Sequence, residues 1–174
     1  MKLFGVIGYP LGHSFSKKYF TEKFVAEGID DCSYETFPIK NIDALIDLIN
    51  QYPNLCGFNI TIPHKKSIIS LLYNKSKLPA GLYACNCVKI TEGKFIGYNT
   101  DIIGFEKSLL PQLKSHHNHA LILGNGGAAE AVKFVLSKLN IQYKVVSRKL
   151  YDGSDLIYTD INQKIIAENL LIIN

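Results

Sequence analysis

The side chains of this sequence that could take part in chemistry stand where short apolar runs give way to polar segments. Ser14 and Ser16 carry hydroxyls two residues apart at the start of a helical segment, a place suited to holding a carboxylate. Asn59 and Thr61 lie on the same side of an expected strand end, and Lys65 follows one turn into the next helical segment. These positions bring hydroxyls, an amide and an amine to the ends of strands.

Two further positions add an amide and a carboxylate. Asn86 stands within an apolar strand, and Asp101 stands where another strand gives way to a helix. Taken singly, each position has an ordinary explanation: Ser14 and Asp101 could cap helices, Lys65 could be a solvated charge, and Asn86 could belong to a turn. Taken together, these groups at strand ends predict a crevice that binds a polyol with a carboxylate.

A glycine-rich segment later in the chain has the setting of a phosphate-binding turn. It directly follows the apolar residues 119–123 and directly opens a helical pattern. Gly124 permits the tight turn, Gly126 lets the backbone approach a pyrophosphate, and Ala129 keeps the helix close to the strand. A purely structural glycine turn is the alternative. The setting favours dinucleotide binding by the whole segment, which consists of Gly124, Asn125, Gly126, Gly127, Ala128 and Ala129.

The end of the next expected strand bears on which dinucleotide is bound. NAD sites usually place an acidic residue there to hold the ribose 2′-hydroxyl. Here the strand ends in Ser147, Arg148 and Lys149. This group favours a 2′-phosphate, which a guanidinium can bind through two hydrogen bonds. A pair of solvated charges is the alternative, and the sequence favours NADP(H) over NAD as the cofactor.

Strands and helices alternate along the first part of the chain and carry these positions. Asn41 is expected to cap the second helix, whose Ile42, Leu45, Ile46 and Ile49 form one apolar face. The alternation predicts an α/β fold in which helices cover a sheet. Hydrophobic patterns predict strands at 3–8, 33–37, 55–60, 84–90 and 94–98, and helices at 14–28, 42–49, 64–72 and 101–113.

The polar segment 114–119 lacks periodicity and marks the expected domain boundary. We expect an α/β substrate-binding domain over residues 1–113 and an incomplete, doubly wound Rossmann-type domain over 114–174. A Rossmann domain has two mononucleotide halves, and the second part of the chain supplies about one, so a truncated chain is expected. Its predicted elements are strands at 119–123, 142–147 and 170–173, and helices from the glycine turn to 139 and at 160–168.

The amino-acid composition limits the kinds of binding partner that are expected for this protein. The net charge is +4 and the basic residues form no run of five, so neither nucleic acid nor a membrane surface is expected. No apolar run approaches the roughly 18 residues of a membrane span. The four cysteines form no Cys-x-x-Cys pair and no secretory signal precedes them, which predicts reduced thiols and a cytoplasmic location. His116, His117 and His119 are expected to lie in a solvated linker rather than a metal site.

The chain resembles the shikimate dehydrogenases over its whole length. Four motifs of the first domain carry the resemblance, in the family's order and spacing, and the glycine turn and the basic strand end match the family's cofactor end. The resemblance implies reduction of 3-dehydroshikimate to shikimate by NADPH, the fourth step toward chorismate. It leaves a monomer and a homodimer both open. The four motifs are Gly8–Ser16, Asn59–Lys65, Ala84–Asn86 and Gly97–Asp101.

The resemblance also implies a role for each substrate-binding residue. Ser14 and Ser16 clamp the substrate carboxylate with help from Thr61. Asn59 and Asn86 contact the ring hydroxyls.

Lys65 and Asp101 are implied to be the pair that moves the proton. Hydride delivery to a ketone leaves an oxyanion, and a positioned ammonium both stabilises it and donates the proton. A carboxylate beside Lys65 fixes its position and favours its charged form.

Three features depart from the family pattern. Lys17 stands where proline is frequent, with little effect expected on the clamp. Ser147 and Lys149 stand where Asn and Thr are common. The chain stops at residues 171–174, before the segment that positions the nicotinamide and before the C-terminal helices that complete the substrate pocket. Two other readings stay open: a quinate/shikimate dehydrogenase that uses NAD, and a non-catalytic fragment that binds shikimate.

Overall fold

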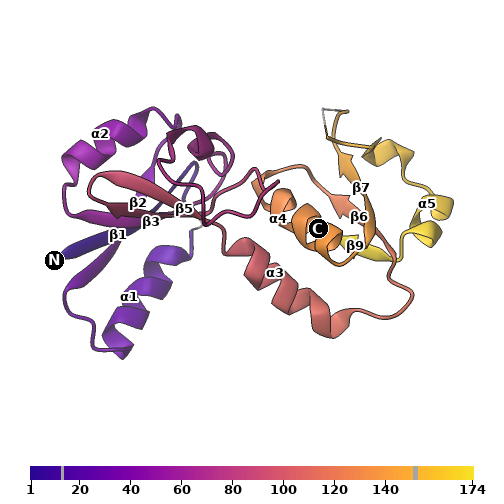
Figure 1. Ribbon diagram of the computed structural model, residues 1–174, viewed down its shortest axis with the longest axis horizontal. Coiled ribbons are helices and arrows are strands. Elements are labelled where there is room, and N and C mark those ends of the chain that lie inside the picture. The colour runs from indigo at the N-terminus through magenta and orange to yellow at the C-terminus, as the bar shows by residue number, and fades with distance from the viewer. Residues whose placement is uncertain (13, 151–152) are drawn as a thin grey trace. The chain divides into compact units, whose positions relative to one another are not determined.

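The computed structural model of the protein describes residues 1–12, 14–150 and 153–174, which form two compact units (Figure 1). The chain divides between Asn99 and Thr100 rather than at residue 114, because the helix that follows Thr100 packs on a helix of the second unit. His13 of the first serine motif and residues 151–152 lie outside the described residues. The assignment of residues 1–113 to the substrate and 114–174 to the cofactor stays a prediction.

A five-stranded mixed sheet forms the centre of the first unit, with the order β2-β1-β3-β4-β5. β1 is parallel to β2 and β3, whereas β4 runs antiparallel to β3 and β5. All five strands expected from the sequence are present, although β4 begins at Cys87 rather than at residue 84. The strands are β1 (Lys2–Gly8), β2 (Cys32–Pro38), β3 (Leu55–Ile60), β4 (Cys87–Thr91) and β5 (Lys94–Tyr98).

Helices lie on both faces of this sheet (Figure 1). On one face, α2 (Ala44–Gln51) buries Leu45 and Leu48 in the core that also contains Ile7 of β1. Ile46 was expected on the same apolar face but is 52% exposed. At 3.6 residues per turn, Ile46 points about 100° around the helix from Leu45, which turns it away from the sheet.

On the other face of the sheet, Phe20 of α1 (Ser16–Ala26) stacks on Tyr34 of β2 with ring centroids 4.5 Å apart. The helix begins later than the expected residue 14, and Ser14 is not its N-cap. Instead, Ser14 belongs to the preceding turn, where its backbone N–H donates to the Leu11 carbonyl at 2.9 Å. The Ser14 hydroxyl is therefore not committed to capping the helix.

The segment after β3 is not the α-helix expected at 64–72. Only Ser67–Leu71 is helical, as the 3₁₀ helix η1. The carbonyl of Lys65 accepts a hydrogen bond from the backbone N–H of Cys85 at 2.8 Å, rather than from a residue one turn further along. Ile68 still donates its N–H to the His64 carbonyl at 3.0 Å, so only the Lys65 carbonyl turns to a distant segment.

The second unit contains a wholly parallel sheet with the order β8-β7-β6-β9. Counted from β6 as the first strand, this order is 3-2-1-4, which is how a Rossmann sheet begins. The expected Rossmann-type fold is therefore confirmed, and β8 is an additional strand that the sequence patterns did not indicate. The strands are β6 (His119–Leu123), β7 (Gln142–Ser147), β8 (Leu156–Ile157) and β9 (Leu171–Ile173).

The helices of the second unit differ from expectation mainly at their ends. Asp101 is the first residue of α3 rather than its N-cap, and the expected helix at 101–113 finishes as a 3₁₀ turn. The helix expected at 160–168 is divided by the extended residue Ile161 into a 3₁₀ helix and a short α-helix. The elements are α3 (Asp101–Leu109), η2 (Leu110–Gln112), α4 (Gly127–Lys138), η3 (Tyr158–Asp160) and α5 (Gln163–Glu168).

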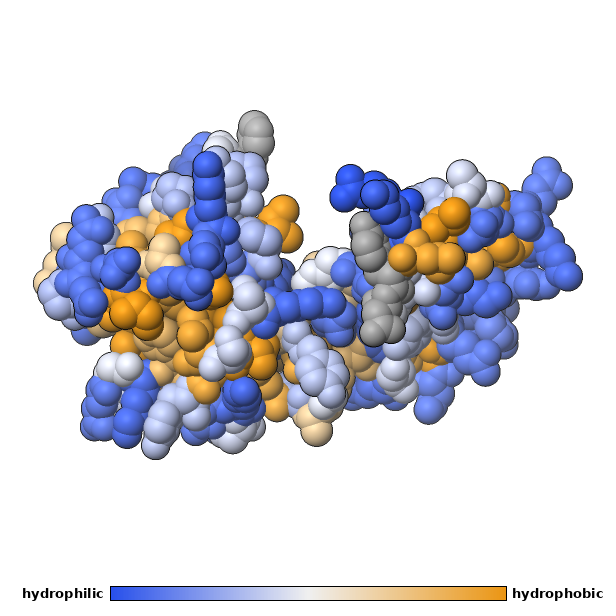
Figure 2. Space-filling model, turned by 90° about the horizontal axis from the view of Figure 1, so that it is seen from above, coloured by the Kyte–Doolittle hydropathy of each residue, from blue (hydrophilic) through white to orange (hydrophobic). Residues whose placement is uncertain are grey.

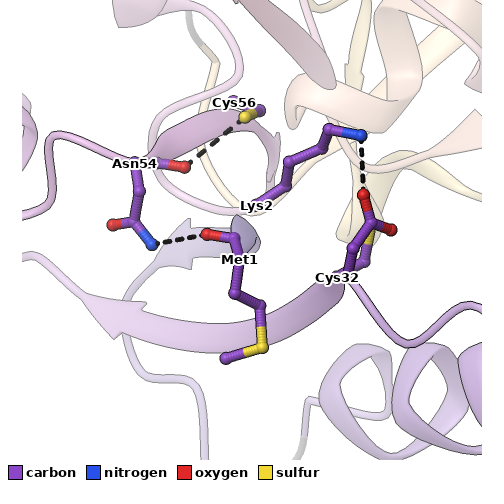
Figure 3. Close-up of polar contacts among 6 residues, drawn as sticks. Met1, Lys2, Cys32, Asn54 and Cys56 are labelled. Atoms are coloured by element: carbon purple, nitrogen blue, oxygen red, sulfur yellow. Dashed lines mark hydrogen bonds and ion pairs between the residues drawn. The ribbon is translucent and has the colours of Figure 1, made fainter.

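Polar contacts tie together the amino-terminal ends of the three parallel strands of the first unit (Figure 3). Lys2 Nζ lies 2.8 Å from Asp31 Oδ2, and Asn54 Nδ2 donates to the Met1 carbonyl at 3.0 Å. Cys56 Sγ donates to the Asn54 carbonyl at 3.4 Å. The predicted substrate residues lie at the other end of these strands.

All four cysteines lie within the described part of the chain and have free thiols. Burial raises the pKa of the Cys85 and Cys87 thiols, which keeps both protonated and unreactive at neutral pH. The expectation of reduced thiols near Asn86 agrees with this environment.

Apolar side chains also reach the surface. Figure 2 shows them on one face of the molecule as orange areas among hydrophilic residues in both units. On α1, Tyr19 and Val25 are 54% and 77% exposed. Among the described residues, no helix combines the length and the apolar character needed to cross a membrane.

Candidate functional site

Most of the predicted substrate residues lie where β3 and β5 end and β4 begins, and this end of the first unit's sheet is called its edge below. β4 runs antiparallel, so its beginning reaches the edge where β3 and β5 end: Asn59 pairs with Cys87, and Cys87 pairs with Tyr98. Just beyond these pairs, Asn86 donates its backbone N–H to Tyr98 (3.1 Å) and accepts from Ile60 (2.8 Å). Asn59 and Asn86 are thereby held on adjacent strand ends.

The loops after β1 and β3 meet tightly at this edge. Thr61 donates its backbone N–H to Ile7 at 3.0 Å, and Tyr9 donates to Ile62 at 2.9 Å. A Cβ atom on Gly8 would lie 2.4 Å from Thr61 Cγ2 and 2.8 Å from the Ile62 carbonyl oxygen. Glycine at position 8 therefore allows the close approach that fixes Thr61 against the end of β1.

Tyr34 links two predicted substrate residues and was not anticipated from the sequence. Its hydroxyl donates to Asn59 Oδ1 at 2.7 Å, and it also makes a side-chain hydrogen bond with Ser16. Burial raises the pKa of Tyr34, with the Ser16 contact opposing the rise. In the sequence, the only indication of this role was an aromatic residue at an inward-facing position of β2.

The Lys65 turn is held on both sides by backbone contacts. The buried His64 ring places Nε2 2.7 Å from the Ile39 carbonyl oxygen, which requires the hydrogen on that nitrogen. The Lys65 carbonyl accepts the N–H of Cys85. Lys65 itself is half-buried. These two contacts fix the backbone of the Lys65 turn.

Asn99 supports the same segment from the end of β5. Its Nδ2 donates to the Ala84 carbonyl at 2.9 Å, and both residues are buried. Asp101 follows two residues later as the half-buried first residue of α3, in the second unit. The pairing of Asp101 with Lys65 stays a prediction.

The predicted dinucleotide turn joins β6 to α4 in the second unit. Gly124 has φ +122°, a conformation that side chains other than glycine rarely adopt. Gly126 occupies the N-cap position in extended conformation, and α4 begins at Gly127, with Ala128 exposed and Ala129 buried. The amino-terminal end of α4 thus lies at the turn, as an anion site requires, although the Ala129 N–H donates to the Gly126 carbonyl at 3.1 Å.

An open cavity of about 700 Å³ lies beside this turn. The cavity extends from the turn across the carboxyl ends of β7 and β8. Its lining residues are Gly124, Asn125, Gly126, Ser147, Arg148 and Tyr158.

Within the turn, Asn125 is held by a lysine from the second turn of α4. Lys133 Nζ lies 2.7 Å from Asn125 Oδ1 and 3.3 Å from Glu130 Oε1. The Lys133 and Glu130 side chains are only 17% and 13% exposed. Lys133 thus balances the carboxylate that stands in the first turn of the helix, where negative charge would otherwise oppose a bound phosphate.

The basic group follows directly on the last residue of β7. Ser147 is buried and its hydroxyl donates to the Lys149 carbonyl, so it stabilises the turn that follows the strand. Arg148 and Lys149 are exposed. Across residues 1–12, 14–150 and 153–174, no cluster of three or more His, Cys, Asp or Glu side chains could hold a metal ion.

Comparison with known proteins agrees with this geometry. Residues 6–88 match the family described as the shikimate dehydrogenase substrate binding domain. A shikimate dehydrogenase (NADP(+)) of Staphylococcus aureus strain MRSA252 is 37% identical over 185 aligned residues, which cover 98% of this chain and 67% of that protein.

Solved structures show the same similarity over both units. Shikimate dehydrogenase 1 of Peptoclostridium difficile is 28% identical with a TM-score of 0.76, over 90% of this chain and 61% of that one. Shikimate 5-dehydrogenase of Thermus thermophilus, solved with NADP(H) and shikimate, is 27% identical with a TM-score of 0.74, over 100% and 63%. The chain thus spans a little under two thirds of these structures. It belongs to the shikimate dehydrogenase family.

Proposed function

We propose that this chain provides the shikimate-binding unit and the NADP-binding turn of a shikimate dehydrogenase, which reduces 3-dehydroshikimate to shikimate. The observation that carries the proposal is the arrangement of Asn59, Asn86 and Thr61 at one sheet edge, next to the anchored Lys65 turn. Family membership and the binding of shikimate and NADP(H) by the Thermus thermophilus relative support it.

In this proposal the serines hold the substrate carboxylate. Ser16 also interacts with the Tyr34 hydroxyl, and this interaction competes with the ligand for its side chain. Ser14 has no capping duty in α1. We therefore expect Ser14 to contribute more than Ser16, while Thr61 completes the clamp.

Asn59 and Asn86 are proposed to bind the ring hydroxyls. Because Asn59 Oδ1 accepts from Tyr34, its Nδ2 group is left to donate to a substrate hydroxyl. The backbone of Asn86 is fixed by its two strand-like hydrogen bonds, which orients the side chain for the same task.

Lys65 and Asp101 are proposed to handle the proton. NADPH, when bound, supplies the hydride to the carbonyl carbon, and Lys65 Nζ donates a proton to the carbonyl oxygen. Asp101 is proposed to hold the ammonium group and to favour its charged form, while a proton from solvent restores the charge after turnover.

The residues of the second unit fit an NADP molecule. The turn from Gly124 to Ala129 offers a left-handed glycine and the amino-terminal end of α4 to the diphosphate. Arg148, with Lys149 beside it, stands where the 2′-phosphate of the adenosine ribose would be bound. β7 ends in Ser147, in place of the acidic residue that would select a free 2′-hydroxyl.

The substrate clamp is tested by replacing its first serine. Ser14→Ala is expected to weaken shikimate binding by about 1 kcal/mol, or about fivefold, the usual loss for one hydrogen bond. Isothermal titration with shikimate measures this, with Ser16→Ala expected to lose less. Ser33→Ala, at the opposite end of the sheet, is the matched control and should bind like wild type. A wild-type chain that shows no heat and no thermal shift at millimolar shikimate would overturn the proposed substrate site.

The cofactor turn is tested through Lys133. Lys133→Met removes both the hydrogen bond to Asn125 and the ion pair with Glu130, so NADP⁺ affinity should fall about 5- to 20-fold. Lys133→Arg should recover most of the loss. Lys138→Met is the control, because it removes an ion pair from the same helix, with Glu106, away from the turn. If NADP⁺ affinity fell equally in the Lys133→Met and Lys138→Met variants, the loss would come from a destabilised α4 and not from the turn.

A further inference from the structure

Tyr158 lines the dinucleotide cavity, and neither the sequence motifs nor the proposed function gives this residue a role. It is the first residue of η3, immediately after β8, and it lines the cavity together with Arg148 and the glycine turn. The side chain is 44% exposed, so the ring is not part of the core of the second unit. An aromatic face at the wall of a cavity is available to a ligand.

The sheet order defines which part of a dinucleotide would meet this ring. Ser147 pairs with Ile157, so Tyr158 is the β8 counterpart of Arg148 at the end of β7. Along the sheet, the cavity therefore runs from the glycine turn after β6, past Arg148, to Tyr158. Two inter-strand spacings, about 10 Å, separate β6 from β8.

This order matches the order of chemical groups in the adenosine half of NADP. The diphosphate lies at the glycine turn and the 2′-phosphorylated ribose lies at Arg148 in the proposed function. The next group outward is the adenine ring. An aromatic side chain can stack on it without depending on hydrogen bonds.

The backbone around Tyr158 is well supported. Asp160 Oδ2 accepts the N–H of Ile157 at 2.9 Å, and Ile161 donates its N–H to the Tyr158 carbonyl at 3.3 Å. Just before β8, Asp155 Oδ2 accepts the N–H of Val145 at 2.7 Å. Both nearby carboxylates are thus engaged by backbone groups, and the ring is presented from a fixed turn.

We propose that Tyr158 is the platform on which the adenine ring stacks, and that it determines affinity for the adenosine half of the cofactor. This inference rests on the proposed binding of NADP by the second unit. It requires the aromatic face and not the hydroxyl, so phenylalanine should serve equally well.

The test measures binding of NADP⁺ and of 2′,5′-ADP to the 174-residue chain by isothermal titration. Tyr158→Ala should weaken both ligands about 5- to 150-fold, the range measured for stacking of one base on an aromatic side chain. Tyr158→Phe should stay within about twofold of wild type. Inorganic pyrophosphate has no ring to stack, so it should bind wild type and Tyr158→Ala equally.

Tyr143→Ala serves as the matched control, because Tyr143 lies on β7 near its amino-terminal end and does not line the cavity. Thermal unfolding of each variant checks that the second unit is folded. A wild-type chain that binds neither nucleotide overturns the proposed function itself. Wild-type binding with an unchanged Tyr158→Ala affinity overturns only the platform, and an equal loss in Tyr158→Phe would assign the effect to the hydroxyl instead.

Discussion

Replacing Lys65 with alanine is expected to lower kcat by about 100-fold or more and to change KM little. As hydride reaches the carbonyl carbon, negative charge develops on the oxygen, and the ammonium both balances that charge and gives up a proton. These interactions are made mainly in the transition state, so their loss appears in kcat.

The Lys65→Ala substitution keeps the backbone contacts that hold this turn. The turn that carries Lys65 is held by the His64 ring and by the Lys65 carbonyl, so removing the amine leaves every one of these anchors in place. Lys66→Ala is the matched control, because Lys66 is the adjacent lysine and its side chain is exposed. It should keep kcat and KM near wild type.

Steady-state reduction of 3-dehydroshikimate by NADPH gives both constants. If turnover requires the rest of the relatives' length, each variant is assayed as a fusion that carries the remaining third of the Staphylococcus aureus relative. A kcat within about threefold of wild type, with only KM raised, would make Lys65 a substrate anchor and remove it from the proton transfer.

Arg148→Ala is expected to reduce the preference for NADP over NAD by about 10- to 150-fold in relative kcat/KM. A guanidinium paired with a phosphate forms a charge-assisted, often bidentate contact worth about 1.5–3 kcal/mol. Arg148 is exposed at the rim of the cavity, where a 2′-phosphate can reach it. Lys149 is a neighbouring point charge, so the double substitution should exceed the single one.

The steady-state assay described for the Lys65 variants, run with NADPH and with NADH, gives the NADP/NAD ratio of kcat/KM for each variant. Lys144→Ala is a suitable control, since it removes an exposed positive charge from the same strand at a distance from the cavity. A ratio that stays constant in the single and double variants, or a wild type that already favours NAD, would show that the basic pair is only a solvated strand end.

Strands that are bounded by turn residues could be predicted closely from the sequence. β3, β6 and β7 begin and end at the residues that the hydrophobic runs indicated, because a short apolar run between polar turns is a local signal. The glycine turn was identifiable for the same reason: its strand, turn and helix are consecutive in the chain.

The features that the sequence did not reveal depend on contacts between distant residues. The segment 64–72 forms only the 3₁₀ helix η1, and its Lys65 carbonyl bonds to Cys85, a contact that no pattern within that segment encodes. Tyr34 reaches Asn59 across β1. β8 has two residues, too few for periodicity, so the position of Tyr158 beside Arg148 could not be read from the chain.

The tight contact at Gly8 has a consequence for how this site can vary in evolution and in engineering. The volume that a Cβ of residue 8 would need is taken by the Thr61 methyl group and the Ile62 carbonyl oxygen. A smaller residue at position 61 could free only the first of these, and the peptide oxygen would still exclude alanine at position 8. Position 8 is therefore restricted to glycine whichever residue stands at position 61, and substitutions that reshape the carboxylate clamp through Thr61 must occur in the presence of Gly8.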